Sequence, residues 1–197
     1  MTKQSVISLR QQTGAGVVDI QKALEEADGD ETKAIEILRK KGAAKALKKQ
    51  DRETHDGAVA AYIHANHRVG AMVELACETD FVARNQEFKD FARELAMQVA
   101  ASNPLYLAPE DVPDDVKEKE MQIYREELQS QGKLAGKSED MIKKIIEGKL
   151  QKYYADACLL EQTSIKDEDK TIKDMVAAMT AKIGEKIVIK RFSRFAL

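Results

Sequence analysis

The sequence predicts an α+β protein in which helices cover one face of a small antiparallel sheet. Two runs of β-branched and small residues, 57–63 and 69–76, flank a short turn and are typical of a β-hairpin. A third such run, 187–189, lies near the end of the chain. Apolar residues at helical spacing occupy much of the remaining chain. This order of elements favours a three-stranded antiparallel sheet with helices packed on it.

The composition indicates a soluble, helix-rich protein. The 197 residues suffice for one large domain or two small ones. The formal net charge of -2 lacks the excess of cations that a general nucleic-acid binder uses to neutralise phosphates. The two cysteines are too few for a disulfide framework and suit a reducing compartment. Without a signal-peptide core or a membrane-spanning run, we expect a cytoplasmic protein that does not bind membranes.

Residues 1–52 are predicted to form a unit of three helices with a linker. The first helix ends at a Thr-Gly-Ala-Gly sequence, and the second has apolar residues at helical spacing over residues 17–27. Asp30 is well placed to cap the third helix, which we expect to end at Gly42. Residues 43–53 would then form a mobile connection.

Residues 53–197 are predicted to form a second unit, which begins with the β-hairpin. The next helix carries an apolar stripe from Phe88 to Val99 and ends before Pro104. A loop then leads into a helical segment at about residues 110–150, with a turn at residues 132–136.

The second helix of this segment is predicted to be capped by Ser138, and Gly148 leaves its continuity open. Asp169 or Thr171 begins a last helix, which Gly184 ends. The terminal strand follows and could join the hairpin as its third member.

Residues 78–85 connect the hairpin to the following helix and leave the direction of Phe81 open. Phe81 lies seven residues before Phe88, so in a helix that begins at Asp80 it would extend the buried stripe. If Asn85 caps the helix instead, Phe81 lies in a turn and its direction is undetermined. The periodicity alone favours burial, but it does not decide between the two alternatives.

No segment of the sequence has the features of an active site. The glycine-rich residues 132–138 lack the spacing of a phosphate-binding loop, and residues 14–16 do not follow a strand, so we interpret both as turns. The three histidines have no partner at metal-ligand spacing, and we expect them to be exposed. The two cysteines are interpreted as buried free thiols. We therefore expect a binding protein without a cofactor or metal, not an enzyme.

A basic run at residues 39–52 holds seven Lys and Arg side chains and one acidic residue. Such a run can contact RNA phosphates, but it more often forms a solvated helix end and linker.

Two long segments have distinctive sequences. The first comprises residues 9–16, LRQQTGAG, and residues 22–27, KALEEA. The second, residues 78–85, reads ETDFVARN. Both resemble the elongation factor Ts family, the guanine-nucleotide exchange factors of elongation factor Tu. Residues 158–162 and 184–192 also look like the family, so the resemblance extends over nearly the whole chain.

This resemblance implies a fold for each unit. Residues 1–52 would adopt a three-helix fold like that of ubiquitin-associated domains, and residues 53–197 would form the exchange and dimerisation core. Longer family members have a duplicated core, whereas this chain has room for one copy. The short form is therefore expected to form a homodimer in which two small sheets pack together.

The resemblance also implies a binding site. In the family, the Thr-Asp-Phe-Val motif intrudes near the magnesium and phosphate site of elongation factor Tu. By position, Asp80 and Phe81 would be the intruding pair, and Thr79 and Val82 would shape the turn. The protein would then promote release of GDP by acting on the GDP and Mg²⁺ bound to its partner, without binding them, or any nucleic acid, directly.

The family's N-terminal domain contacts the G domain of the partner near the nucleotide. Arg10, Val17 and Val18 are the candidates for this contact. Many relatives have Met at one or both valine positions, so the apolar character is retained.

Two other functions are compatible with parts of the sequence. The three-helix pattern alone would suit an adaptor that binds ubiquitin-like proteins, but it leaves residues 54–197 unexplained. The basic run would suit an RNA-binding accessory protein of translation, which the net charge disfavours.

Overall fold

The protein is described by a computed structural model over residues 3–134 and 136–197, and its fold is α+β, as predicted. These residues form eight α-helices, two short 3₁₀ helices and one three-stranded antiparallel sheet. In chain order the elements are α1 (Lys3–Thr13), α2 (Val17–Glu26), α3 (Glu31–Leu47), β1 (Asp56–Ile63), β2 (Val69–Cys77), α4 (Asp80–Arg84), α5 (Gln86–Ser102), η1 (Pro109–Asp111), α6 (Asp114–Ser130), α7 (Glu139–Ala157), η2 (Leu159–Glu161), α8 (Ile172–Ile183) and β3 (Val188–Ala196).

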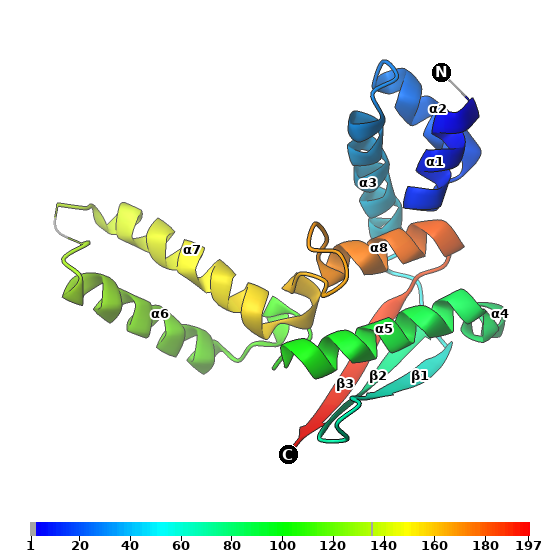
Figure 1. Cartoon of the computed structure of the whole chain (residues 1–197). Helices are drawn as coiled ribbons and strands as arrows, with labels where there is room; N and C mark the ends of the chain where they lie inside the picture. Colours follow the sequence, from blue (N-terminus) through cyan, green and yellow to red (C-terminus); the bar gives the residue numbers. More distant parts are fainter. Residues whose placement is uncertain (1–2, 135) are drawn as a thin grey trace.

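Figure 1 shows how these elements are arranged in three parts. Helices α1, α2 and α3 form an N-terminal unit that meets α8 through α3. The sheet lies below α8 in this view, and α5 crosses its three strands. Helices α6 and α7 form an antiparallel arm that projects away from the sheet, on the side opposite to α4.

The sheet has the order β1-β2-β3, so the terminal strand joins the hairpin as predicted. In the first pair the register runs from Asp56 opposite Cys77 to Ile63 opposite Gly70. The second pair is irregular between Glu74 and Leu75. Gly57 is required in β1, because a Cβ atom there would lie 2.3 Å from the backbone oxygen of Leu75.

The largest core lies between the sheet and α5. Alternate residues of β2 point into it, because successive side chains of a strand face opposite sides. Helix α5 contributes the apolar stripe predicted from the sequence, and Phe88 is completely buried at its start. Helix α8 packs into the same core with Ile172, Met175 and Met179.

The N-terminal unit has a separate small core, as expected for a domain like the ubiquitin-associated domains. It is formed by the buried apolar residues Leu9, Ile20, Ala23, Leu24, Ala27, Ala34 and Leu38. The predicted cap of α3 is confirmed, since the backbone N–H of Lys33 donates to the Asp30 carboxylate at 3.1 Å.

The predicted end of α3 at Gly42 is wrong. The helix continues to Leu47, so the first part of residues 43–53 is helical and not a connection. Gly42 lies against α8, where a Cβ atom would be 3.6 Å from that of Ala181. Packing of α3 on α8 therefore continues the helix through a residue of low helix propensity.

The two helices of the arm and the Ser138 cap are as predicted from the sequence. The Ser138 hydroxyl accepts a hydrogen bond from the backbone of Met141 at 3.4 Å, and α7 continues through Gly148. Leu128 of α6 and Ile146 of α7 are buried between the two helices. Ala135, in the predicted turn at the tip of the arm, lies outside the described residues.

We predict that Phe88→Ala lowers the free energy of unfolding by about 3–5 kcal/mol, because it removes a buried aromatic ring and leaves a cavity. Urea unfolding followed by circular dichroism measures this change. Phe81→Ala is the matched control, since the exposed Phe81 should contribute less than about 0.5 kcal/mol. A loss of several kcal/mol in Phe81→Ala would contradict the orientation of this side chain.

Candidate functional site

Phe81 lies on the short helix α4, and 81% of its surface is exposed to solvent. The following residues anchor the helix, because Ala83 is buried and Val82 packs against the main core. The prediction from periodicity that Phe81 is buried is therefore wrong. The ring of Phe81 is therefore held outward on an anchored turn, where it is accessible to a partner.

The outward direction of Phe81 follows from a break at Asn85. The backbone of Asn85 is extended, with φ -63° and ψ 132°, so α4 and α5 are separate helices. Its side chain accepts a hydrogen bond from the backbone N–H of Glu87 at 2.8 Å, which caps α5. Because the helical phase restarts here, the spacing between Phe81 and Phe88 no longer places them on one face.

The turn that precedes α4 is held by the carboxylate of Glu185. One oxygen of Glu185 accepts hydrogen bonds from the backbone N–H groups of Glu78 and Thr79, at 3.2 and 3.0 Å. The other accepts a bond from the Thr79 hydroxyl at 2.7 Å. Asp80 pairs with Arg84 across α4 at 3.0 Å. Thus the backbone and the hydroxyl of Thr79 both bind a partner more than a hundred residues away.

The side chain of Glu78 makes a second link between the same two segments. Its carboxylate accepts a hydrogen bond from the backbone N–H of Lys186 and pairs with Arg52 at 3.2 Å. The bond from Lys186, with a smaller contribution from Arg52, holds the pKa of Glu78 below its ordinary value of 4.5. Glu78 is therefore ionised at neutral pH.

The candidate contact residues of the N-terminal unit are also exposed. Arg10 lies in the last turn of α1, and Val17 and Val18 open α2. Their side chains do not contribute to the small core of this unit. In Figure 1, α1, α2 and α4 lie toward the right, whereas the arm extends to the left.

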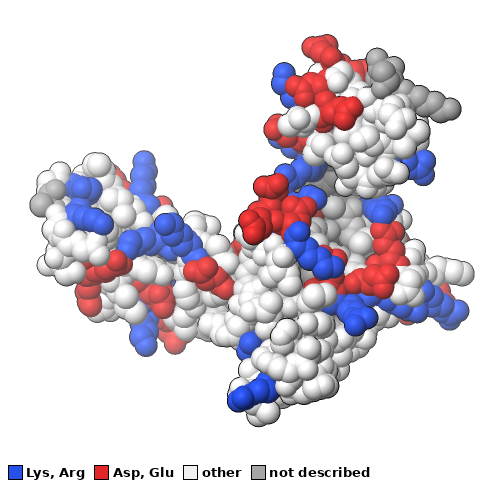
Figure 2. All heavy atoms as spheres, in the orientation of Figure 1, with Lys and Arg blue, Asp and Glu red and all other residues white. Residues whose placement is uncertain are grey.

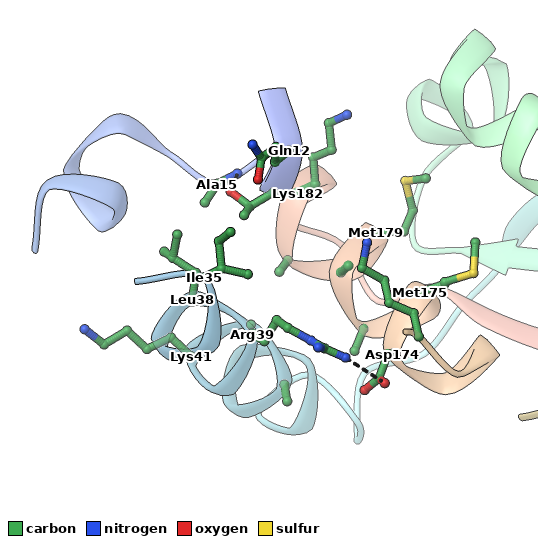
Figure 3. Close-up of a pocket in the computed structure, with 18 of the residues that line it drawn as sticks. Gln12, Ala15, Ile35, Leu38, Arg39, Lys41, Asp174, Met175, Met179 and Lys182 are labelled. Atoms are coloured by element: carbon green, nitrogen blue, oxygen red, sulfur yellow. Dashed lines mark hydrogen bonds and ion pairs between the residues drawn. The ribbon is translucent and has the colours of Figure 1, made fainter. Parts of the chain in front are cut away.

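A cleft of about 470 Å³ lies between the N-terminal unit and the main core. Figure 3 shows that Ile35, Leu38 and Arg39 of α3 face Asp174 and Met179 of α8 across it. An ion pair of 3.3 Å joins Arg39 to Asp174. None of residues 79–82 lines this cleft, so it is separate from the turn that carries Phe81.

Most basic side chains of residues 39–52 bind other groups of the same chain. Figure 2 shows basic and acidic side chains next to each other where the N-terminal unit meets the rest of the molecule. Five of the seven basic side chains bind acidic side chains or backbone oxygens, and these are Arg39, Lys41, Lys45, Lys49 and Arg52. The run therefore ties elements of the chain together.

The remaining candidate groups are the three histidines and the two cysteines. The three histidines are exposed, as predicted. Cys77 and Cys158 are buried free thiols, as predicted, and burial raises the pKa of each to about 11. Within residues 3–134 and 136–197, no cluster of His, Cys, Asp or Glu could hold a metal ion. None of the helices over the same residues is long and apolar enough to cross a membrane.

Comparison with known families agrees with this architecture. A family model described as Elongation factor TS matches residues 31–197, which include the whole sheet and residues 79–82, called here the Phe81 turn. The chain belongs to the elongation factor Ts family. It is thus related to factors of translation elongation.

Similar proteins described as Elongation factor Ts match along nearly the whole chain. The protein from Caldanaerobacter subterraneus subsp. tengcongensis is 51% identical over 195 residues, which cover 99% of this chain and 96% of that protein. The protein from Thermotoga maritima is 52% identical over 189 residues, with 96% and 92% covered. The one from Carboxydothermus hydrogenoformans is 52% identical over 197 residues, with 100% and 89% covered.

These matches include both candidate surfaces of the elongation factor Ts fold. Residues 79–82 lie inside the region of the family model. Arg10, Val17 and Val18 lie before that region, but the match to the Carboxydothermus protein spans all 197 residues. The structure leaves these two surfaces as separate patches on different helices.

The partners of the Phe81 turn were not foreseen from the sequence. Glu185 and Lys186 lie more than a hundred residues after the groups that they bind. In the sequence Arg52 belongs to a basic run, and nothing there indicates that it pairs with Glu78. No local pattern identifies these pairs, because the strand pairing that brings β2 and β3 together creates them.

We predict that Glu78→Gln lowers the free energy of unfolding by about 1–2 kcal/mol at pH 7, because it weakens charge-assisted hydrogen bonds. The lowered pKa of Glu78 means that this stabilisation is present above pH 4.5 and is lost as the pH falls below it. Urea unfolding between pH 7 and pH 3 should show the difference narrowing. Glu53→Gln, which changes a carboxylate on a side chain that is 82% exposed, is the control.

A difference between Glu78→Gln and the unchanged protein that stayed constant down to pH 3 would contradict this assignment.

Proposed function

We propose that the chain is a guanine-nucleotide exchange factor for elongation factor Tu, which promotes release of GDP by inserting Asp80 and Phe81 near the Mg²⁺ and phosphate site of its partner. The observation that carries this proposal is the exposure of Phe81 on a turn held by hydrogen bonds and by a packed helix. Membership of the elongation factor Ts family supports the choice of partner.

Exchange by such a factor follows from thermodynamic linkage. A factor that binds the nucleotide-free partner more tightly than the GDP-bound partner must weaken GDP binding by the same ratio. The factor therefore acts by binding alone and needs no proton transfer or covalent step. In this proposal it is not an enzyme in the chemical sense and uses no cofactor of its own.

The residues of the turn have separate roles in this proposal. Phe81 enters the partner as an aromatic wedge and shifts a packed switch element. Burial of its ring would contribute about 1.5–3 kcal/mol to the complex, which offsets the cost of its exposure in the free protein. Asp80 brings a carboxylate toward the cation, and displacement of Mg²⁺ removes the charge that holds the phosphates. Thr79 and Val82 fix the direction of the pair.

The N-terminal unit supplies a second contact with the G domain of the partner. Arg10 would bind through its guanidinium group, and Val17 and Val18 would bury apolar surface. Two separate contacts raise the overall affinity, because the second forms at the high effective concentration set by the first. The protein would act in the cytoplasm on GDP and Mg²⁺ held by elongation factor Tu, without direct contact with nucleic acid or membrane.

We predict that Phe81→Ala lowers the acceleration of GDP release about 10- to 100-fold, the factor that corresponds to the lost burial of the ring. The measurement is release of labelled GDP from elongation factor Tu at increasing concentrations of the factor. Leu105→Ala is the matched control, because Leu105 is also a largely exposed apolar residue but lies far from α4 in the chain. A folded Phe81→Ala protein with full activity would contradict the proposal.

The homodimer is proposed from the face of the sheet that α5 does not cover. On this face four apolar side chains are between 48% and 73% exposed, and these are Val59, Ile63, Met72 and Phe195. The register places them in adjacent rows across all three strands. Sheets normally bury an apolar face against another layer, and the sheet of a second copy would supply that layer.

We predict that the protein has twice the mass of one chain in light scattering at micromolar concentration. Met72→Lys should shift it toward the monomer, because the substitution places a charge in the centre of the interface. Ile123→Lys, which changes an equally exposed residue of α6, should leave the mass unchanged. A monomer mass for the unchanged chain would exclude this assembly.

A further inference from the structure

The connection between α8 and β3 binds two other parts of the chain, the turn before α4 and the linker from the N-terminal unit. It runs from Gly184 to Ile187, and its first three residues, Gly184, Glu185 and Lys186, are called here the 184–186 connection. Gly184 ends α8 in the left-handed conformation, with φ 88°, which favours glycine. This sharp end brings the next two residues next to the end of β2, where the Phe81 turn begins.

Glu185 and Glu78 form a reciprocal arrangement at this point. The carboxylate of Glu185 binds the backbone of Glu78 and both the backbone and the hydroxyl of Thr79. The carboxylate of Glu78 in turn binds the backbone of Lys186. Two segments that lack regular strand pairing are thus joined by four hydrogen bonds, each accepted by a carboxylate oxygen.

The Thr79 hydroxyl takes part in this arrangement. Threonine at the start of a helix usually accepts a hydrogen bond from the backbone of that helix. Here Thr79 precedes α4 without making such a bond, and its hydroxyl donates to Glu185 at 2.7 Å instead. The direction of the first turn of α4 is therefore set from outside the helix, by Glu185.

The same connection holds the linker from the N-terminal unit. The ammonium group of Lys186 donates to the backbone oxygens of Gln50 and Arg52 at 2.6 and 2.7 Å. Lys49 donates to the backbone oxygen of Gly184. Arg52 closes the arrangement through Glu78. The linker and the Phe81 turn therefore share one support.

We propose that Glu185 is a positioning residue for nucleotide exchange, which holds the turn before α4 in the one orientation that presents Phe81 to the partner. This inference rests on the proposed function and adds a residue to it. A turn fixed before binding loses less conformational entropy on insertion than a turn that must first be ordered. Glu185 acts through Thr79 and Phe81 and does not itself touch the nucleotide.

The test is Glu185→Gln, measured by release of labelled GDP from elongation factor Tu. The amide keeps the size of the side chain but removes its charge and replaces one of the two acceptor oxygens with an N–H₂ group. We expect the maximal rate of release to fall about five- to tenfold, because the hydrogen bonds that hold the turn are weakened but not all lost. The concentration of factor at half-maximal rate should change less, because the remaining contact surface is intact.

A double-mutant cycle with Phe81→Ala separates positioning from general stability. If Glu185 acts by presenting Phe81, then Glu185→Gln should have little further effect once the ring is absent. Fully additive losses would overturn the proposal, and so would full activity of a folded Glu185→Gln protein. Glu161→Gln, which removes the partner of Lys173 elsewhere on the surface, is the matched control and should retain activity.

The outcomes distinguish this proposal from the one on which it rests. Loss of activity in Phe81→Ala with none in Glu185→Gln would overturn the positioning role alone. Full activity of Phe81→Ala would overturn the proposed function as well. If Glu185→Gln does not fold, Glu185→Asp carries the same test. It keeps the charge but is one methylene too short to reach all three donors, so an intermediate loss supports the proposal and full activity overturns it.

Discussion

The extended backbone at Asn85 is the constraint on which the candidate site depends. It separates α4 from α5, so that the buried stripe begins at Phe88 and the preceding aromatic residue is free to point outward. The break is stable because the Asn85 side chain satisfies a backbone N–H that α5 would otherwise leave unpaired. Without it, a continuous helix would bury Phe81 in the same core and remove the exposed aromatic residue from the surface.

The break at Asn85 fixes the direction of Phe81 only if α4 is held at both ends. Ala83 and the half-buried Val82 fix α4 to the core from one side, and Glu185 fixes the entry to α4 from the other. Exposed ion pairs such as Asp80 with Arg84 add little stability by themselves. Hydrogen bonds to backbone groups are different, because they fix the path of the chain as well as the position of a side chain.

The sequence alone predicted the elements that depend on local patterns. The hairpin follows from alternation around a turn, the stripe of α5 from helical spacing, and the caps at Asp30 and Ser138 from the chemistry of helix starts. The end of α3 was predicted wrongly for a physical reason. A glycine near basic residues is typical of a helix end, but here contact with α8 outweighs the low helix propensity of Gly42.

The sequence could nominate residues for the candidate site but could not predict their geometry. Periodicity counts residues and assumes an unbroken helix, so it favoured burial of Phe81, whereas the resemblance to elongation factor Ts favoured exposure. The supports of the turn are invisible to both arguments, since Glu78 and Lys186 become neighbours only when β3 pairs with β2. The same pairing brings the linker to the turn through Lys186. The N-terminal unit and the Phe81 turn are therefore linked by the connection that precedes the terminal strand, although the chain between them runs through the hairpin.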